Sequence, residues 1–446
     1  MSEGKTGKHA LVFIFITIFI DITGLGIIIP VAPKLIAELA HVGLSDAARY
    51  GGWLFFVYAG MQFLFAPVIG NLSDRFGRRP VLILSLVAIA IDYAITGLAP
   101  TIVWLFVARV LSGMAGASYT TAGAYIADVT PPEKRAANFG LIGAAFGLGF
   151  IVGPAIGGIL GEYGTRLIGY DGAHLSSYAA AGLAFAKWIL GAHGVRLPFF
   201  VSAALAFSNA LYGFLVLAES LPKESRRKFE IWRANPLGAL VALRRFPFVL
   251  PLCGVIVLMR IAHDSNPATW TYYTMLKFHW TTAQVGYSLM AVGAITALVY
   301  GGLTRVAIPL LGEVRAVYLG LAAAATAFAG YAFATEGWML YAWMVVGSLA
   351  GLAAPALSAI MSKEVGPTEQ GELQGAIASV GSLTSVGAPL AMSYLFAFFT
   401  SRAAPFYFPG AAFLAASLCV VLAAAVFAWV RPETTAAAAK SSQVAE

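Results

Sequence analysis

Charge is scarce in this sequence. Asp, Glu, Lys and Arg make up 11% of the 446 residues, whereas 59% are hydrophobic and the mean hydropathy is +0.81. Soluble globular proteins carry about 25% charged residues, so the composition excludes an ordinary soluble domain. Cysteine is also scarce. Cys253 and Cys419 both fall in apolar segments, which excludes a disulfide framework.

Several functional signatures are missing as well. The sequence contains no nucleotide-binding P-loop, no Cys/His spacing typical of a metal site and no set of paired catalytic residues. We therefore expect no enzyme activity, no metal and no cofactor. The net charge of +7 could suggest nucleic acid, but the basic residues gather between apolar runs. That distribution favours a role in setting membrane topology.

Long apolar runs, in contrast, are abundant. A bilayer core requires about 20 apolar residues per helix, and twelve runs reach that size. They predict an all-α integral membrane protein with 12 transmembrane helices, the first of which is too long for a signal peptide. The predicted helices are 9–37, 50–71, 80–99, 101–126, 135–161, 197–218, 247–272, 283–308, 315–334, 337–361, 373–400 and 405–430.

The basic residues also predict the orientation of the chain. The two termini and the loops after the even-numbered helices hold 19 of the 28 Lys and Arg residues. By the positive-inside rule, both termini are then cytoplasmic.

The chain is expected to consist of two six-helix halves, 1–218 and 247–430. A basic cytoplasmic linker, 219–246, joins them, and a disordered cytoplasmic tail, 431–446, follows. An external insertion at about 168–197 interrupts the first half. It is either a decorative loop or a functional cap with an interfacial helix.

The halves resemble each other weakly. Asp128–Glu133 follows the fourth helix and Glu364–Glu369 follows the tenth, while Pro154 in the fifth helix is echoed by Pro389 in the eleventh. Two related six-helix halves place a substrate site at their interface near the middle of the membrane.

Two acids lie inside apolar runs, Asp21 in the first and Asp92 in the third. A carboxylate at the membrane centre costs about 2.5–3.5 kcal/mol on insertion scales, so one that is retained there usually has a function. Arg109 in the fourth helix needs acceptors, and Asp21 and Asp92 are its candidates. Alternatively, Arg109 reaches out to the lipid headgroups. These residues predict a transporter that handles protons or cations.

A short polar loop, 70–80, joins the second and third helices. Arg78 or Arg79 can reach Asp128 below the fourth helix, and such pairs would latch one arrangement of the helices. Alternatively, the arginines of this loop only set the topology. The predicted gating residues are Asp74, Arg75, Gly77, Arg78, Arg79 and Asp128.

The fifth helix is rich in glycine. Glycines four and five residues apart let another backbone approach closely, and a proline bends the helix by removing one hydrogen bond. Such a helix suits the rocking of one half against the other, although ordinary small-residue packing is an alternative. The motif residues are Gly149, Gly153, Pro154, Gly157 and Gly158.

These motifs resemble those of the major facilitator superfamily, and most of all the twelve-helix drug/proton antiporters that include the tetracycline efflux proteins. Loop 70–80 matches the superfamily pattern G-x-x-x-D-R-x-G-R-R, and 149–158 matches the antiporter pattern G-x-x-x-G-P-x-x-G-G. Asp21 with Pro30 fits the first-helix motif of drug exporters. The resemblance implies a multi-pass protein of the bacterial inner membrane, and proton coupling that involves Arg109.

The second half departs from the tetracycline exporters. The resemblance places Thr296 and Ala324 where those proteins carry a histidine and an aspartate. The seventh helix instead carries Arg260, His263 and Asp264, of which 260 and 264 share one helix face. We predict that His263 and Asp264 take part in proton coupling. The alternative is a wet cluster near the outer end of the helix.

The function predicted from these features is proton-coupled export of drug-like amphiphilic small molecules by alternating access. The alternative is a transporter of the same fold for a sugar, an amino acid or a siderophore. The expected partners are the small-molecule substrate, protons and the lipid bilayer, without nucleic acid, and the protein is expected to be a monomer driven by the proton gradient. The predicted substrate-binding residues are Tyr58, Gln62, Tyr93, Arg260, Trp270 and Tyr300.

Overall fold

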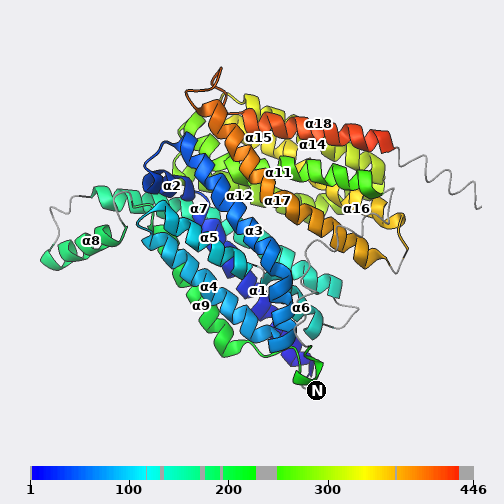
Figure 1. Ribbon diagram of the computed structural model, residues 1–446, viewed down its shortest axis with the longest axis horizontal. Coiled ribbons are helices and arrows are strands. Elements are labelled where there is room, and N and C mark those ends of the chain that lie inside the picture. The colour runs from blue at the N-terminus through cyan, green and yellow to red at the C-terminus, as the bar shows by residue number, and fades with distance from the viewer. Residues whose placement is uncertain are drawn as a thin grey trace, which may run out of the picture. The chain divides into compact units, whose positions relative to one another are not determined.

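The structure is a computed structural model that describes residues 3–116, 118–130, 135–170, 176–190, 194–227, 249–366 and 369–430. In these ranges all regular structure is helical, as the composition predicts (Figure 1). The predicted linker 219–246 is described only as far as residue 227, and the predicted tail 431–446 lies outside the described residues.

The helices of the first half follow the predicted apolar runs closely. They are α1 (Glu3–Ile28), α2 (Ala32–Ala40), α3 (Leu44–Phe76), α4 (Arg78–Leu98), α5 (Ile102–Gly116), α6 (Ser118–Val129), α7 (Arg135–Gly169), α8 (Ser177–Leu190) and α9 (Leu197–Val216).

The second half repeats the pattern after a short 3₁₀ turn, η2 (Lys223–Ser225). Its elements are α11 (Val249–Phe278), α12 (Thr282–Leu298), the π-helix η5 (Val299–Leu303), α13 (Thr304–Leu311), α14 (Glu313–Phe333), α15 (Gly337–Ser348), the 3₁₀ helix η6 (Leu349–Leu352), α16 (Ala353–Lys363), α17 (Gln370–Thr400) and α18 (Ala411–Val430).

The predicted number of twelve spans is only partly confirmed. Among the described residues, ten helices are long and apolar enough to cross a membrane, or eleven if the bent pair 12–28 and 32–40 forms one span. This pair bends by 50° next to Pro30, which cannot donate a backbone hydrogen bond. The predicted eighth helix, 283–308, is divided by η5, so α12 alone is too short to count.

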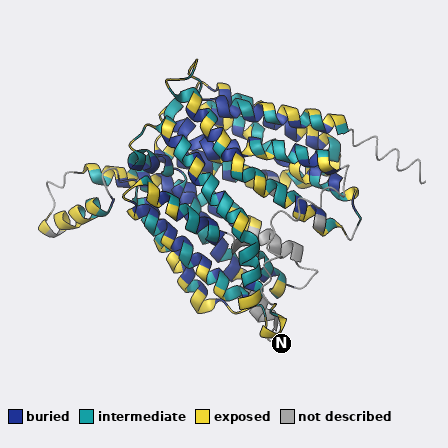
Figure 2. Cartoon of the chain, viewed as in Figure 1, coloured by how far each residue is buried: buried dark blue, intermediate teal, exposed yellow. Residues whose placement is uncertain are grey.

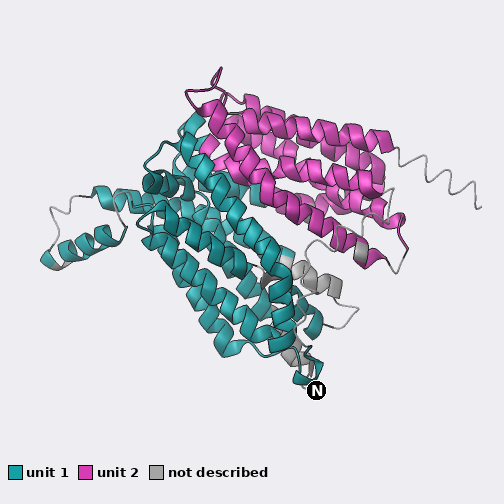
Figure 3. Cartoon of the chain, in the orientation of Figure 1, with its two compact units in different colours: residues 1–235, 274–293 teal, residues 236–273, 294–446 magenta. Residues whose placement is uncertain are grey.

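The described helices form two compact units, each of which is shown in its own colour in Figure 3. Unit 1 contains 1–235 together with 274–293, and unit 2 contains 236–273 together with 294–446. Segment 274–293 belongs with unit 1 because the start of α12 packs on α7. A Cβ atom added to Gly158 of α7 would lie 2.9 Å from Cα of Ala283.

An internal repeat is visible in the helix boundaries. Helices α4 and α14 begin 235 residues apart, at Arg78 and Glu313, and the glycines before them, Gly77 and Gly312, have φ angles of 103° and 77°. The repeat extends to an ion pair whose charges are exchanged. Arg78 pairs with Asp128 at 3.2 Å, and the equivalent Glu313 pairs with Lys363 at 2.7 Å. The weak resemblance between the halves is therefore structural.

The two ends of the predicted insertion lie at one place in unit 1. The backbones of Gly164 and Gly194 touch, and Gly194 has a φ of 67°, which favours glycine. Between them lies α8, most of whose described side chains are exposed (Figure 2). The two ends of the predicted insertion therefore lie close together, and its role as a decorative loop or a functional cap stays a prediction.

Candidate functional site

Asp92 is the most deeply buried acid among the described residues. It lies in the second half of α4, and its side chain has 0% exposure. Arg109 of α5, whose side chain is 18% exposed, approaches it with 3.3 Å between Nη2 and Oδ2. Asp92, one of the two acids predicted as acceptors for Arg109, therefore pairs with it.

A polar cluster surrounds this pair inside unit 1. Asp21 of α1 is half-buried and lies three residues before Gly24. Tyr93 is 4% exposed, and a Cβ on Gly24 of α1 would lie 3.4 Å from its ring. The structure therefore brings Asp21 to the same region of the helix bundle as Asp92.

Gln62 adds an amide to the cluster. Its Nε2 donates to the carbonyl of Gly116 at 3.1 Å, and it lies one turn after Tyr58 on α3. The glycines of α5 allow this approach, because a Cβ on Gly116 would lie 2.9 Å from Oη of Tyr58. We name Asp21, Tyr58, Gln62, Asp92, Tyr93 and Arg109 the acidic cluster.

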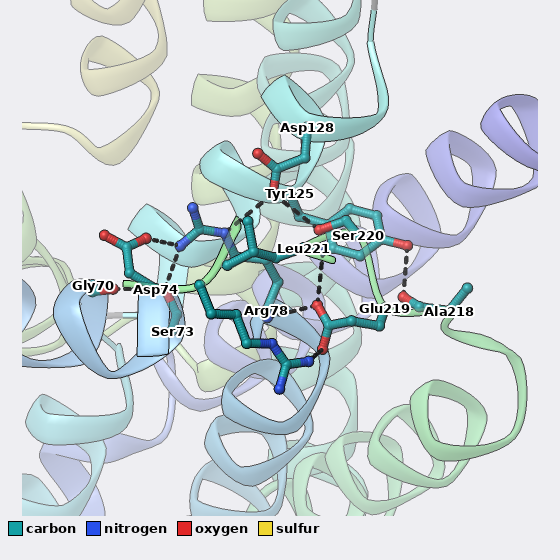
Figure 4. A network of polar contacts seen from close by, with 11 residues as sticks. Gly70, Ser73, Asp74, Arg78, Tyr125, Asp128, Ala218, Glu219, Ser220 and Leu221 are labelled. Carbon is teal, nitrogen blue, oxygen red and sulfur yellow. Dashed lines mark hydrogen bonds and ion pairs between the residues drawn. The ribbon is translucent and has the colours of Figure 1, made fainter. Parts of the chain in front are cut away.

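The loop between α3 and α4 forms a network of polar contacts, seen from close by in Figure 4. Arg78 is its centre. Its Nη1 donates to Ser73 at 2.7 Å and to Asp74, and its Nε donates to Asp128 at 3.2 Å. Gly77 makes the sharp turn with a φ of 103°. The predicted contact of this loop with Asp128 is therefore present, and Arg78 makes it.

The other arginine that could have reached Asp128 is placed differently. Arg79 Nη2 donates to the carbonyl of Phe214 in α9 at 2.8 Å. Successive residues of a helix point in different directions, so Arg78 and Arg79 at the start of α4 serve different neighbours. Arg75 lies over the ring of Phe76, 5.0 Å from its centroid.

Sequence reasoning missed two members of this network. Glu219 Oε1 accepts from the backbone N–H of Arg78 at 2.8 Å, so it caps the start of α4. Ser220 donates to Asp128 at 3.0 Å. The only available signal was their position directly after the sixth apolar run. We name Ser73, Asp74, Arg78, Asp128, Glu219 and Ser220 the loop network.

Asp74→Asn is expected to slow turnover sharply while substrate affinity stays nearly unchanged. The substitution weakens the charge pair with Arg78 but leaves the acidic cluster intact. Initial transport rates at several substrate concentrations measure this split. A large loss of affinity at normal turnover would assign the loop to binding instead. Asp46→Asn removes an exposed pair with Arg49 and is the control.

The glycine motif of α7 packs against α1. A Cβ on Gly149 would lie 2.9 Å from Cβ of Ile22, and one on Gly153 would lie 2.6 Å from the carbonyl oxygen of Thr23. Gly157 meets the backbone of Ile27 even more closely. Gly158 faces α12, so the two predicted glycine spacings serve two different neighbours.

Pro154 does not end α7, which continues to Gly169. Its ring lies where a Cβ on Gly26 of α1 would meet it at 2.8 Å. The motif therefore places three helices in close backbone contact within unit 1, as the spacing predicts.

The predicted cluster on the seventh helix lies in the middle of α11. Arg260 is the twelfth residue of this 30-residue helix, and the choice between proton coupling and a wet cluster stays a prediction. Arg260 Nε donates to Oγ of Ser385 in α17 at 2.7 Å, and Ser385 donates to Oδ2 of Asp264 at 2.8 Å. Nδ1 of His263 lies 3.5 Å from Oδ1 of Asp264.

Two predicted substrate-binding residues have other outcomes. Trp270 is 5% exposed and packs edge to face on Tyr331 and Phe413, at 5.3 and 6.0 Å between ring centroids. It belongs to the aromatic core of unit 2, because α14 and α18 cover its face of α11. The side chain of Tyr300 lies outside the described residues.

Ten described helices that are long and apolar enough to cross a membrane, arranged in two related sets, define a class of polytopic membrane proteins. Residues 14–170 and 165–389 match the family described as Major Facilitator Superfamily. The chain belongs to this superfamily, and its curated relatives include tetracycline resistance proteins. It is accordingly a multi-pass membrane transporter of small molecules and not an enzyme.

Two relatives illustrate the degree of similarity. The class C tetracycline resistance protein of Escherichia coli is 36% identical over 391 residues, which cover 87% of this chain and 90% of the relative. The class G protein of Vibrio anguillarum is 35% identical and covers 87% and 91%.

Solved structures share the fold. An inward-facing, unoccupied bacterial homolog of the human lysosomal transporter Spinster has a TM-score of 0.74 at 19% identity, and the match covers 95% of this chain and 97% of that one. The human organic anion transporter MFSD10 has a TM-score of 0.64 at 22% identity and covers 94% and 99%.

Proposed function

We propose that this protein exports an amphiphilic small molecule from the bacterial cytoplasm in exchange for protons. It works by alternating access in the inner membrane, as a monomer with both termini in the cytoplasm. The observation that carries the proposal is Asp92, a fully buried carboxylate that is paired with Arg109 in the middle of an apolar bundle. Burial of a charged group in an apolar bundle is costly, so we expect this carboxylate to have a functional role.

The charges of the acidic cluster support proton exchange. Asp21, Asp92 and Arg109 carry a net charge of −1 when all three are ionised, and one bound proton makes the cluster neutral. When the helices change their arrangement, a neutral cluster in a low-dielectric interior costs less electrostatic energy than a charged one. A substrate that binds near Tyr58 and Gln62 would compete with that proton.

Energetics allow this mechanism to work without ATP. One proton that enters across 100 mV releases about 2.3 kcal/mol, which maintains roughly a fiftyfold substrate gradient. We assign the loop network to gating. We assign the glycine motif of α7 to the movement of closely packed helices.

The test uses everted membrane vesicles and an efflux-deficient bacterium. A susceptibility panel, with and without expression, identifies an exported compound. Adding that compound to vesicles with a preformed pH gradient should then collapse part of the gradient. Transport that continues undiminished after the gradient is dissipated would contradict proton exchange and favour the polar-metabolite alternative or another ion.

Tetracycline is expected to be a poor substrate. Ala324 is 8% exposed in α14, so that the second half offers an apolar residue where the resemblance places an acid. Asp264 is already paired with Arg260 and attracts a cationic tetracycline–magnesium chelate less strongly. We expect little tetracycline resistance on expression, and loss of export of the true substrate in Asp264→Asn. Strong tetracycline resistance that survives this substitution would contradict both expectations.

A further inference from the structure

We propose that Arg260 binds an anionic oxygen group of the exported molecule, so that the substrate is an amphiphile with a carboxylate or a similar oxyanion. This inference rests on the proposed transport function and names its substrate class. Its basis is the pair of contacts that Arg260 makes with Ser385 and Asp264. Nε donates to Oγ of Ser385 at 2.7 Å and lies 3.4 Å from Oδ1 of Asp264.

The terminal nitrogens of Arg260 are left available. Among the described residues, no hydrogen bond from Nη1 or Nη2 of Arg260 is present, and its side chain is 47% exposed. Asp264, in contrast, is only 5% exposed. The buried carboxylate and Ser385 thus hold one edge of the guanidinium, and the opposite edge presents a fork of donors that suits a carboxylate.

The exposed surface around Arg260 is unlike a lipid-facing one. His263 is 68% exposed one turn along α11, and the face of α17 that carries Ser385 continues with the exposed residues Ser382, Ala378 and Gln374. The exposed residues of α18 are all apolar, and they include the large side chains of Leu418, Val421 and Leu422. A guanidinium and an imidazole at mid-helix are costly against lipid. We infer that this face borders a polar, substrate-accessible space.

The balance of charge favours an anion over a cation here. With Asp264 ionised and His263 neutral, the three-residue cluster is neutral overall, but its negative charge is buried and its positive charge is exposed. A ligand in front of the cluster therefore meets the guanidinium first. The hydrophobic part of the amphiphile would lie on the surrounding small and apolar side chains.

The experiment measures binding without any ion gradient, so that failure of proton coupling does not affect it. Purified protein in detergent is exposed to pairs of probes that differ only in charge: dansylglycine with dansylglycinamide, 1-naphthylacetate with 1-naphthylacetamide, and decanoate with decanamide. Thermal stabilisation and quenching of tryptophan fluorescence report binding. We expect at least one carboxylate to bind more tightly than its amide, by about tenfold or more.

Variants then assign the preference to Arg260. Arg260→Gln should abolish the preference, so that each carboxylate binds no more tightly than its amide. Arg402→Gln, which changes an exposed arginine of unit 2, should have no effect. Ser385→Ala should weaken carboxylate binding several-fold, because Ser385 is a positioning residue that orients the guanidinium.

Asp264→Asn gives the most diagnostic result. If Arg260 serves only to neutralise Asp264, anion binding should either stay unchanged or be lost in this variant. If Arg260 is the anion site, removing the competing carboxylate should tighten carboxylate binding several-fold, even though transport fails. Equal binding of every carboxylate and its amide, or no binding of any probe, would overturn the proposal, as would a preference that persists in Arg260→Gln.

Discussion

Asp92→Asn is expected to reduce coupled export to the level of cells that lack the protein, while the protein still inserts and folds. Asparagine has nearly the volume of aspartate but neither charge nor a titratable proton. The substitution leaves Arg109 without its ion-pair partner and takes away the most buried proton acceptor of the acidic cluster. Export measured in everted vesicles reports the loss, and size-exclusion profiles report folding.

Asp46→Asn is the matched control, because Asp46 is 52% exposed in a surface pair with Arg49. Such pairs contribute about 0–1 kcal/mol, and export should remain normal. Full activity in Asp92→Asn would show that the buried pair is structural. A second measurement separates coupling from binding. Exchange of labelled substrate without a net gradient should persist in Asp92→Asn if only the proton step is lost.

The sequence predicts the helices well because apolar length is a strong signal. The bounds of α4, predicted as 80–99 and observed as Arg78–Leu98, show how closely the runs follow the structure. The bend after Ile28 and the π segment at Val299–Leu303 were not predicted. Both are local changes in backbone hydrogen bonding, and hydropathy does not report them.

The candidate site was predictable where charge stands out against an apolar background. Asp92, Arg109 and Arg260 are visible for that reason, and so is the fixed spacing of the loop from Asp74 to Arg79. Ser385 and Glu219 were missed. A serine is common in a glycine-rich helix, and an acid is common in a charged loop. Only the contact of Ser385 with Arg260, and that of Glu219 with the start of α4, distinguish these two residues.

Trp270 shows where the sequence carries less information. It is one of the aromatic and amide side chains predicted to bind substrate, and the structure buries it among aromatic rings of α14 and α18. Periodicity specifies which residues share a face, and it does not specify whether that face meets a cavity or another helix. Only tertiary packing separates the two.

Gly157→Ala is expected to impair both stability and transport strongly, whereas Gly143→Ala on the same helix should be nearly neutral. A Cβ at position 157 would overlap the backbone of Ile27, which cannot move aside as a flexible side chain does. A Cβ at position 143 meets nothing within 4 Å. Overpacking of this kind costs about 1–3 kcal/mol.

The pair of variants also tests what the glycine motif is for. If close contact between α7 and α1 serves only to pack the bundle, Gly157→Ala lowers the thermal unfolding midpoint, and the surviving folded protein transports normally. If the contact is part of the rocking movement, transport per folded molecule falls about tenfold or more, in line with the same energy. Equal behaviour of the two variants would contradict the packing argument itself, because the two positions differ mainly in the backbone they approach.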